Sequence, residues 1–171
     1  MRIKDSGNRR EFESGAVRDV AEGKGRCDLL PLDIIGKMMN DAILDSIGTY
    51  IRDGDYSHLW NAIRVFMYKA FPMDGEASSQ RMANMFLEVA KHYEEGAKKY
   101  AERNWEKGIS LHCYIDSGVR HYLKWMRGDE DEPHDRAFVW NMLGAIWTQE
   151  HLPHLNDLPF AKQEVDNGHY R

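Results

Sequence analysis

The sequence is poor in the β-branched residues that sheets favour. It has two threonines, seven valines and ten isoleucines, together 19 of 171 residues. Alanine, leucine, methionine, glutamate and lysine, all good helix formers, are preferred instead. A chain of this length forms one domain with its own hydrophobic core. The composition therefore predicts an all-α domain and argues against a sheet-rich fold.

Other scarcities exclude several classes of protein. The two cysteines, Cys27 and Cys113, are too few for a disulfide scaffold and form no CxxC pair. The formal net charge of −5 argues against a nucleic-acid coat. The longest uncharged stretch in the C-terminal half, residues 137–149, is too short to span a bilayer, and the first residues lack the apolar segment of a secretory signal. We therefore expect a cytoplasmic protein without nucleic-acid or membrane partners.

Apolar periodicity and capping residues predict a bundle of about five helices. The expected helices span residues 31–52, 57–71, 79–101, 110–128 and 133–149. Before them lies a polar, glycine-punctuated segment, residues 1–30, which we expect to form an extended arm. After them, residues 153–171 are typical of a polar tail.

The fifth expected helix carries two polar residues that packing does not explain. Asn141 lies in an otherwise apolar run, and His134 lies two turns earlier on the same face. A buried amide without partners costs about 1–3 kcal/mol, so Asn141 needs a partner. Either it bonds to neighbouring backbone as a core asparagine, or it faces a site inside the bundle.

The connection before this helix is strongly acidic. Residues 128–135 contain five carboxylates beside His134, more than the helix dipole needs. Carboxylates beside an imidazole form a ligand set for a divalent metal. Asp131 and Glu132 are therefore candidates for metal binding or catalysis, and the alternative is a solvated acidic loop.

Two other expected helices carry charged residues within a few turns. The third has Glu95 beside Gly96, a mid-helix glycine that favours close approach by another helix or a ligand. The fourth has Asp116, Arg120 and His121, although an Asp–Arg pair at i, i+4 can be only a structural ion pair. Because bundle interiors are where carboxylate and histidine metal sites are built, these residues are candidates for one shared site.

Basic and aromatic residues complete the candidate set. Lys99 precedes a loop in which Asn104 and Trp105 offer an amide and a stackable indole. In the arm, residues 15–19 with Arg18 and residues 23–26 with Lys24 and Arg26 offer positive charge on a flexible backbone suited to phosphate, although the spacing of a P-loop is missing. Neither cysteine has a histidine partner evident from the sequence, so no nucleophilic triad is predicted.

Several segments together resemble a phage-associated family, the dATP/dGTP diphosphohydrolases, which are related to the MazG-like all-α pyrophosphohydrolases. The resemblance is carried by residues 15–19, 23–26, 28–31, 94–100, 104–108, 120–121 and 140–141. Within this family the sequence is most similar to the MazZ group of phages whose DNA contains 2-aminoadenine. The similarity covers about residues 15–31 and 88–150.

The sequence departs from the MazG pattern in its acidic motifs and its spacing. MazG-type enzymes hold Mg²⁺ with EExxE and ExxD motifs, but Lys98 stands where the third acid of the first motif would fall. Residues 132–135 only imitate the second motif. Relatives also have less sequence before the third expected helix, so we interpret residues 31–80 as a helical insertion, forming a lid or an oligomer contact, and residues 81–152 as the catalytic core.

The resemblance implies Mg²⁺- or Mn²⁺-dependent hydrolysis of a purine nucleoside triphosphate to the monophosphate and pyrophosphate. We expect catalytic carboxylates at Glu95, Asp116, Asp131 and Glu132, and metal ligands at Glu95, His121, Asp131 and His134. We expect nucleotide contacts from Lys24, Arg26, Lys99, Asn104, Trp105, Arg120 and Asn141.

The resemblance also implies a substrate and a setting. The expected substrate is dGTP or GTP, giving dGMP for 2-aminoadenine nucleotide synthesis in the host cytoplasm of a phage. The alternatives are an enzyme that removes dATP and a non-catalytic helical adaptor. Because the helices are short and have apolar faces, we expect a homodimer or homotetramer.

Overall fold

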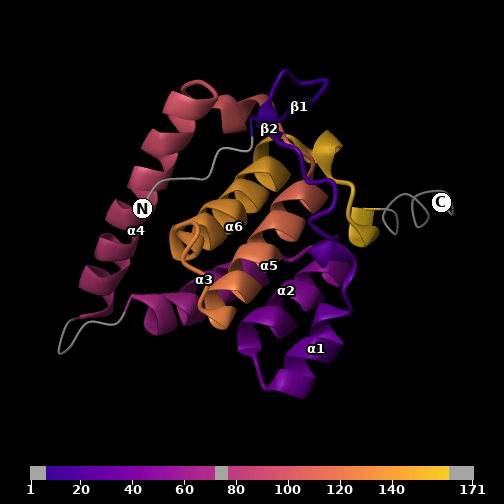
Figure 1. Ribbon diagram of the computed structural model, residues 1–171. Helices are drawn as coiled ribbons and strands as arrows, with labels where there is room; N and C mark the ends of the chain where they lie inside the picture. The colour runs from indigo at the N-terminus through magenta and orange to yellow at the C-terminus, as the bar shows by residue number, and fades with distance from the viewer. Residues whose placement is uncertain (1–6, 72–76, 162–171) are drawn as a thin grey trace, which may run out of the picture.

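The computed structural model describes residues 7–71 and 77–161, which fold into an all-α bundle with one small hairpin (Figure 1). The strands are β1 (Arg9–Glu11) and β2 (Val17–Asp19), and the α-helices are α1 (Leu32–Met39), α2 (Ala42–Asp53), α3 (Ser57–Ala70), α4 (Ser78–Lys99), α5 (Leu111–Arg127) and α6 (His134–His151). Short 3-10 helices cover Cys27–Leu29 (η1), Asn104–Lys107 (η2) and Pro153–Leu155 (η3). The predicted fold class is confirmed.

The first expected helix, residues 31–52, is wrong as a single element, because it breaks into α1 and α2. Asn40 adopts the left-handed conformation, and the Asp41 carboxylate then caps α2 by accepting hydrogen bonds from two of its amides. The two helices cross so closely that a Cβ on Gly36 would lie 2.4 Å from the Asp45 nitrogen, and one on Gly48 would lie 2.3 Å from the Asp33 nitrogen. Glycine is required at both positions because backbone meets backbone there.

The pair α5 and α6 forms the centre of the bundle (Figure 1). As predicted, α6 is buried on nearly all sides, and α5 runs from Ser110, its N-cap, to Gly128, its left-handed C-cap. Phe66 of α3 packs against Tyr122 of α5 and Phe138 of α6. Helices of the 31–80 segment therefore belong to the same hydrophobic core as α5 and α6. Its proposed role as an insertion stays a prediction.

The helix α4 stands at the side of the bundle, and much of it faces solvent (Figure 1). Met85 and Val89 on its apolar face are buried, but Met82 and Phe86 are 37% and 41% exposed. The expected approach of another helix at Gly96 is wrong, because a Cβ there would meet no atom within 4 Å, whereas the expected approach of a ligand stays a prediction. The apolar face of α4 is therefore only partly covered by the core.

The segments at the two ends are more ordered than the sequence indicated. The expected arm folds back as an antiparallel hairpin in which Arg9 pairs with Asp19 and Glu11 with Val17. In the expected tail, Leu158 and Phe160 are buried in the core. The rest of that tail, residues 162–171, lies outside the described residues. Within the described part of the chain, no helix is long and apolar enough to cross a membrane.

Candidate active site

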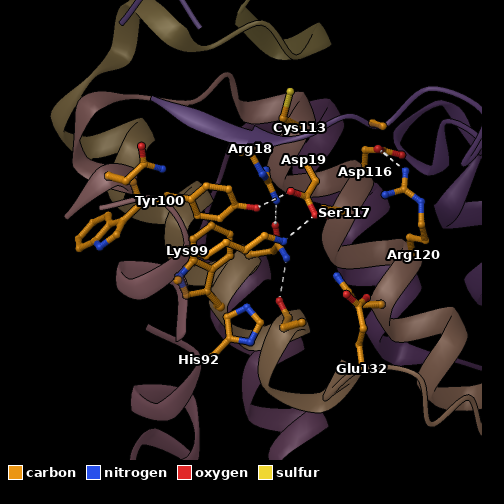
Figure 2. Close-up of a pocket in the computed structure, with 18 of the residues that line it drawn as sticks. Arg18, Asp19, His92, Lys99, Tyr100, Cys113, Asp116, Ser117, Arg120 and Glu132 are labelled. Carbon is orange, nitrogen blue, oxygen red and sulfur yellow. Dashed lines mark hydrogen bonds and ion pairs between the residues drawn. The ribbon is translucent and has the colours of Figure 1, made fainter. Parts of the chain in front are cut away.

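A cavity of about 1070 Å³ lies between the hairpin, α4, η2, α5 and the start of α6 (Figure 2). Eleven of the thirteen predicted site residues line it: Lys24, Arg26, Lys99, Asn104, Trp105, Asp116, Arg120, His121, Asp131, Glu132 and Asn141. The other two do not. His134 lies buried behind His121, and Glu95 is half-buried on α4 outside this lining. The fold thus brings most of the predicted residues around one space.

Arg18 of β2 holds a central place in this cavity, and sequence reasoning did not select it as a site residue. Its guanidinium donates to the Asn141 carbonyl oxygen at 2.8 Å and lies over the rings of Tyr114 and Trp140, 5.2 and 5.4 Å from their centroids. One terminal nitrogen, Nη1, is buried without a partner among the described residues. Asn141 also donates to the Ala137 carbonyl at 2.7 Å, so it serves both as a satisfied core residue and as a residue of the cavity.

The hairpin is fixed over the cavity by Asp19. Its carboxylate accepts hydrogen bonds from Lys99 Nζ at 2.7 Å and from the Tyr100 hydroxyl at 3.0 Å, both at the end of α4 (Figure 2). Burial and then the charge of Asp19 raise the pKa of Tyr100. Lys99, predicted to bind phosphate, therefore already carries a carboxylate partner.

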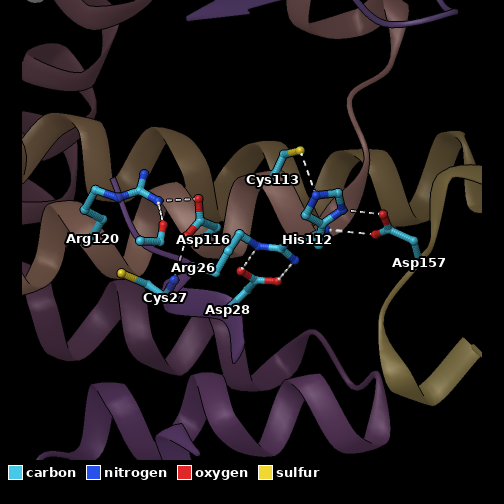
Figure 3. Close-up of polar contacts among 9 residues, drawn as sticks. Arg26, Cys27, Asp28, His112, Cys113, Asp116, Arg120 and Asp157 are labelled. Atoms are coloured by element: carbon cyan, nitrogen blue, oxygen red, sulfur yellow. Dashed lines mark hydrogen bonds and ion pairs between the residues drawn. The ribbon is translucent and has the colours of Figure 1, made fainter. Parts of the chain in front are cut away.

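A second cation of the cavity is paired in the same way. Arg120 donates to the Asp116 carboxylate and, at 2.9 Å, to the Gly25 carbonyl (Figure 3). Asp116 also accepts from the Cys27 amide at 2.7 Å. Arg26, also predicted to bind phosphate, forms two hydrogen bonds with Asp28. Asp116 and Arg120 thus hold the N-terminal segment against α5, a structural role that the sequence analysis had left open.

Asn104, predicted to contact the nucleotide, bonds instead to the backbone of β2. Its carbonyl oxygen accepts from the Val17 amide and its amide nitrogen donates to the Val17 carbonyl, both at 2.9 Å. The side chain therefore anchors β2 as a neighbouring strand would. Trp105 packs edge-on against Tyr93 and Trp147 at centroid distances of 5.7 and 4.9 Å.

A chain of three hydrogen-bonding groups joins the acidic loop to the cavity wall. Asp131 lies 2.8 Å from His134 Nε2, and His134 Nδ1 lies 2.9 Å from His121 Nδ1. The hydrogen bond from Lys124 and then that from His134 lower the pKa of Asp131, so its carboxylate is ionised and only accepts. In the tautomer in which His134 donates from Nε2 to Asp131 and accepts at Nδ1, His121 donates from Nδ1 and carries a lone pair on Nε2.

Two histidines that line the cavity, His121 and His92, are kept neutral by burial. Burial and then the neighbouring His134 lower the pKa of His121 well below its usual value. Burial and then the charges of Arg136 and Arg18 lower the pKa of His92 to about 4. His92 Nδ1 is buried without a hydrogen-bond partner in the described structure. Both rings line the cavity, so at neutral pH they present unprotonated nitrogen rather than positive charge.

Among residues 7–71 and 77–161, two groups of side chains have the composition of a divalent metal site. One is His121, Glu132 and His134, and the other is Asp129, Asp131 and His134; within each, potential ligand atoms lie within 4.8 Å of one another. In the described arrangement, however, both ring nitrogens of His134 are engaged in hydrogen bonds. Glu95 belongs to neither group. The predicted metal set of Glu95, His121, Asp131 and His134 is therefore not gathered into one group, because Glu95 lies apart and His121 and Asp131 fall in different groups.

Comparison with known families places this site in context. The model of the family described as dATP/dGTP diphosphohydrolase, N-terminal, matches residues 73–158, half of the chain. The chain belongs to this family. No curated protein and no solved structure matches the chain.

The segment of this chain that matches the dATP/dGTP diphosphohydrolase family contains α4, α5 and α6, and therefore one side of the cavity. It includes the whole Asp131–His134–His121 chain. The hairpin with Arg18 and the segment with Arg26 lie outside the match, although the sequence resemblance had extended to residues 15–31. The cavity thus joins a family segment to a wall built by the N-terminal part of this chain.

Proposed function

We propose that this protein hydrolyses a purine deoxynucleoside triphosphate, dGTP or dATP, to the monophosphate and pyrophosphate. The observation that carries the proposal is the shared cavity: most residues predicted for this reaction from the sequence line one space in a member of the dATP/dGTP diphosphohydrolase family. Its volume of about 1070 Å³ is at the upper end of the usual range for small-molecule sites, which suits a nucleotide.

The walls of the cavity match the chemistry of a nucleotide. The aromatic side includes Tyr93, Trp105 and Trp140, against which a purine can stack. Arg18 is the cation best placed to contact phosphate, because its main polar partner is a neutral amide, Asn141, rather than a carboxylate. Its guanidinium offers donors in the planar arrangement that phosphate oxygens accept.

His121 is proposed to take the proton from the attacking water. Its ring lines the cavity, and in the tautomer in which Nδ1 donates to His134 the lone pair lies on Nε2. As Nε2 gains a proton, His134 supports the positive charge by accepting the Nδ1 hydrogen, and Asp131 accepts from His134 in turn. Such a hydrogen-bonded series fixes the orientation of the base and stabilises its protonated form. This proposal replaces the expected carboxylate base with an imidazole.

A divalent ion fits the adjoining carboxylates. Glu132 with His121 and His134, or Asp129 and Asp131 with His134, offer the mixture of oxygen and nitrogen ligands that Mn²⁺ accepts, whereas Mg²⁺ prefers oxygen alone. When bound, the ion would draw negative charge from the phosphates and lower the pKa of a bound water. Because an ion on Nε2 would occupy the lone pair, metal binding and proton transfer are alternative roles for His121. Binding of Mn²⁺ to His121→Gln, measured by calorimetry without nucleotide, separates them.

Three finer proposals rest on the sequence resemblance. We propose dGTP as the preferred substrate and dGMP as a precursor of 2-aminoadenine nucleotides in a phage, with dATP removal as the alternative activity. We propose a homo-oligomer, and the exposure of Phe86 and Leu87 on α4 supports a face that a second copy would cover. The adaptor alternative is disfavoured by membership of a hydrolase family.

The reaction is tested by hydrolysis in ¹⁸O-labelled water. Purified protein is incubated with dGTP, dATP or GTP and with Mg²⁺ or Mn²⁺, and products are followed by chromatography and ³¹P NMR. Attack at the α-phosphorus places the label in the monophosphate. Label in pyrophosphate would place the attack at the β-phosphorus, and release of orthophosphate would contradict the proposal. His121→Gln should lower turnover by about 10²–10⁴-fold, the usual contribution of a general base. The exposed His154→Gln serves as the matched control.

A further inference from the structure

Cys113 forms a nucleophile–base–acid arrangement that the sequence did not reveal (Figure 3). Its Sγ lies 3.3 Å from His112 Nε2, and the Nδ1 of the same ring is hydrogen bonded to the Asp157 carboxylate. Asp157 also accepts from the His112 backbone amide at 2.9 Å. The carboxylate thus holds the imidazole by its ring and its backbone, and the other ring nitrogen faces the sulfur.

Positively charged groups and a helix N-terminus lie close to the Cys113 sulfur. Cys113 is the third residue of α5, where the helix dipole stabilises an anion. On the same helix, the Cys113 sulfur contacts His112. From the segment before η1, the positive charge of Arg26 interacts with Cys113, although Arg26 is also paired with Asp28. From the segment after η3 comes Asp157, which contacts the far side of the imidazole rather than the thiol.

The titration of the neighbouring groups agrees with this geometry. The hydrogen bond with Asp157 and then that with Cys113 raise the pKa of His112 to about 10, so its ring is positively charged at neutral pH. The other cysteine offers a contrast within the same chain. Burial raises the pKa of the Cys27 thiol, and no imidazole contact is recorded for its sulfur among the described residues.

We propose that Cys113 is a reactive thiolate, held as an ion pair with His112 and oriented by Asp157, and that it is a site of covalent modification by hydroperoxides and other small electrophiles. The site goes beyond the proposed hydrolysis, because it needs neither nucleotide nor metal. Cys113 is half-buried and lines the large cavity, so small reagents reach its sulfur from there.

The modification is a simple displacement at the electrophile. With iodoacetamide, the sulfur forms a bond to the methylene carbon as the carbon–iodine bond breaks, iodide leaves, and the proton stays on His112. With hydrogen peroxide, the sulfur bonds to one oxygen as the O–O bond breaks. The leaving hydroxide takes the His112 proton and becomes water, the sulfur is oxidised by two electrons to a sulfenic acid, and the peroxide is reduced.

The pH dependence of alkylation tests the proposal, with Cys27 as an internal control. The full-length protein is treated with iodoacetamide between pH 6 and 9.5, and each cysteine is quantified by peptide mass spectrometry. A thiol with an ordinary pKa of about 8.5 reacts roughly 50-fold faster at pH 8.5 than at pH 6.5. Cys113 should change less than about twofold over this range, because its sulfur is already ionised. A Cys113 rate that rises in parallel with that of Cys27 would overturn the proposal.

Variants of the partner residues test the cause. His112→Gln should restore the steep pH dependence at Cys113, and Asp157→Asn should shift the profile part of the way. A thiolate held in an ion pair is also a weaker nucleophile, so the variant should react faster than the native protein above pH 9. If His112→Gln unfolds the chain, Cys27 will also become fast, which separates misfolding from the expected result. A native-like profile at Cys113 in the folded variant would exclude the ion pair.

The peroxide reaction gives a second, independent readout. Under limiting hydrogen peroxide and a dione trap for sulfenic acid, the trapped adduct should form on Cys113 at least fivefold faster than on Cys27. His112→Gln should remove most of this difference at pH 6.5. Equal trapping on both cysteines of the native protein would contradict the proposed site.

Discussion

Acidification from pH 7 to pH 5 should destabilise the fold through His92. Its pKa is about 4 in the folded protein and 6.5 in a model peptide, because burial and the nearby Arg136 and Arg18 disfavour its charged form. Between these two values the unfolded chain binds more protons than the folded chain. The contribution of neutral His92 to the free energy of unfolding is therefore present above the unfolded pKa of 6.5, and it is lost as the pH falls from 6.5 towards 4.

The size of the effect follows from the two pKa values. Linkage gives a loss of about 2 kcal/mol between pH 7 and pH 5 from His92 alone. His121 acts in the same direction because burial and then His134 lower its pKa. Urea unfolding at the two pH values measures the total. His92→Gln keeps a neutral polar side chain, so its stability should fall by about 2 kcal/mol less than that of the native sequence over this range.

The matched control for this experiment is His154→Gln, in the exposed η3 segment. It should leave the pH dependence of the native sequence unchanged. If His92→Gln loses as much stability as the native sequence between pH 7 and pH 5, the burial argument for His92 is refuted. A loss confined to pH values below 4 would point instead to the carboxylates.

Three further predictions concern the cavity and the helix contacts. Arg18→Met should weaken binding of a non-hydrolysable dGTP analogue by about 10- to 100-fold in calorimetry, because a hydrogen bond to a charged group contributes about 1.5–3 kcal/mol. The control is Arg9→Met, on the same hairpin but outside the cavity lining, which should change the affinity less than twofold. Gly48→Ala should lower the free energy of unfolding by about 1–3 kcal/mol, because the added Cβ overpacks the contact with α1. Gly96→Ala should raise the free energy of unfolding by about 1 kcal/mol, because its Cβ meets no atom and alanine is the better helix former. Equal effects of the two substitutions would contradict the packing argument. Asn104→Ala should accelerate hydrogen exchange at the β2 amides by about tenfold, and unchanged exchange would show that its bonds to Val17 do not hold the strand.

The sequence allowed prediction of features with a local signal. The bounds of α5 follow from Ser110 and Gly128 at its ends, and the burial of α6 follows from its continuous apolar run. The break between α1 and α2 had a local signal too, the Asn40–Asp41 pair, but the unbroken apolar stripe across it concealed the cap. Local capping thus outweighed hydrophobic periodicity at that point.

Features that depend on contacts between residues far apart in the chain could not be predicted from the sequence. Asp157 lies 45 residues from His112, and nothing local shows that the chain after η3 returns to the start of α5. The position of Arg18 likewise depends on Asn104, 87 residues away from the Val17 peptide that it holds. Residue types indicated most of the residues that line the cavity, because acids, histidines and cations are unusual on apolar helix faces. Which of these side chains pair with one another could be seen only in the folded structure.

The pairing of charges in the cavity explains how an acidic chain could accept a polyphosphate. Lys99 and Arg120, which alone would attract phosphate, are each bonded to a carboxylate, Asp19 and Asp116. Among the described cations of the cavity, a triphosphate would therefore meet mainly Arg10, Arg18 and Lys24, for which no carboxylate partner is recorded. Binding then requires additional cations, and the carboxylates of the acidic loop are suited to supply them by holding a divalent ion that also contacts the substrate. Under this proposal, the carboxylates that make the chain acidic hold the divalent ion, and the ion supplies the positive charge that a triphosphate requires.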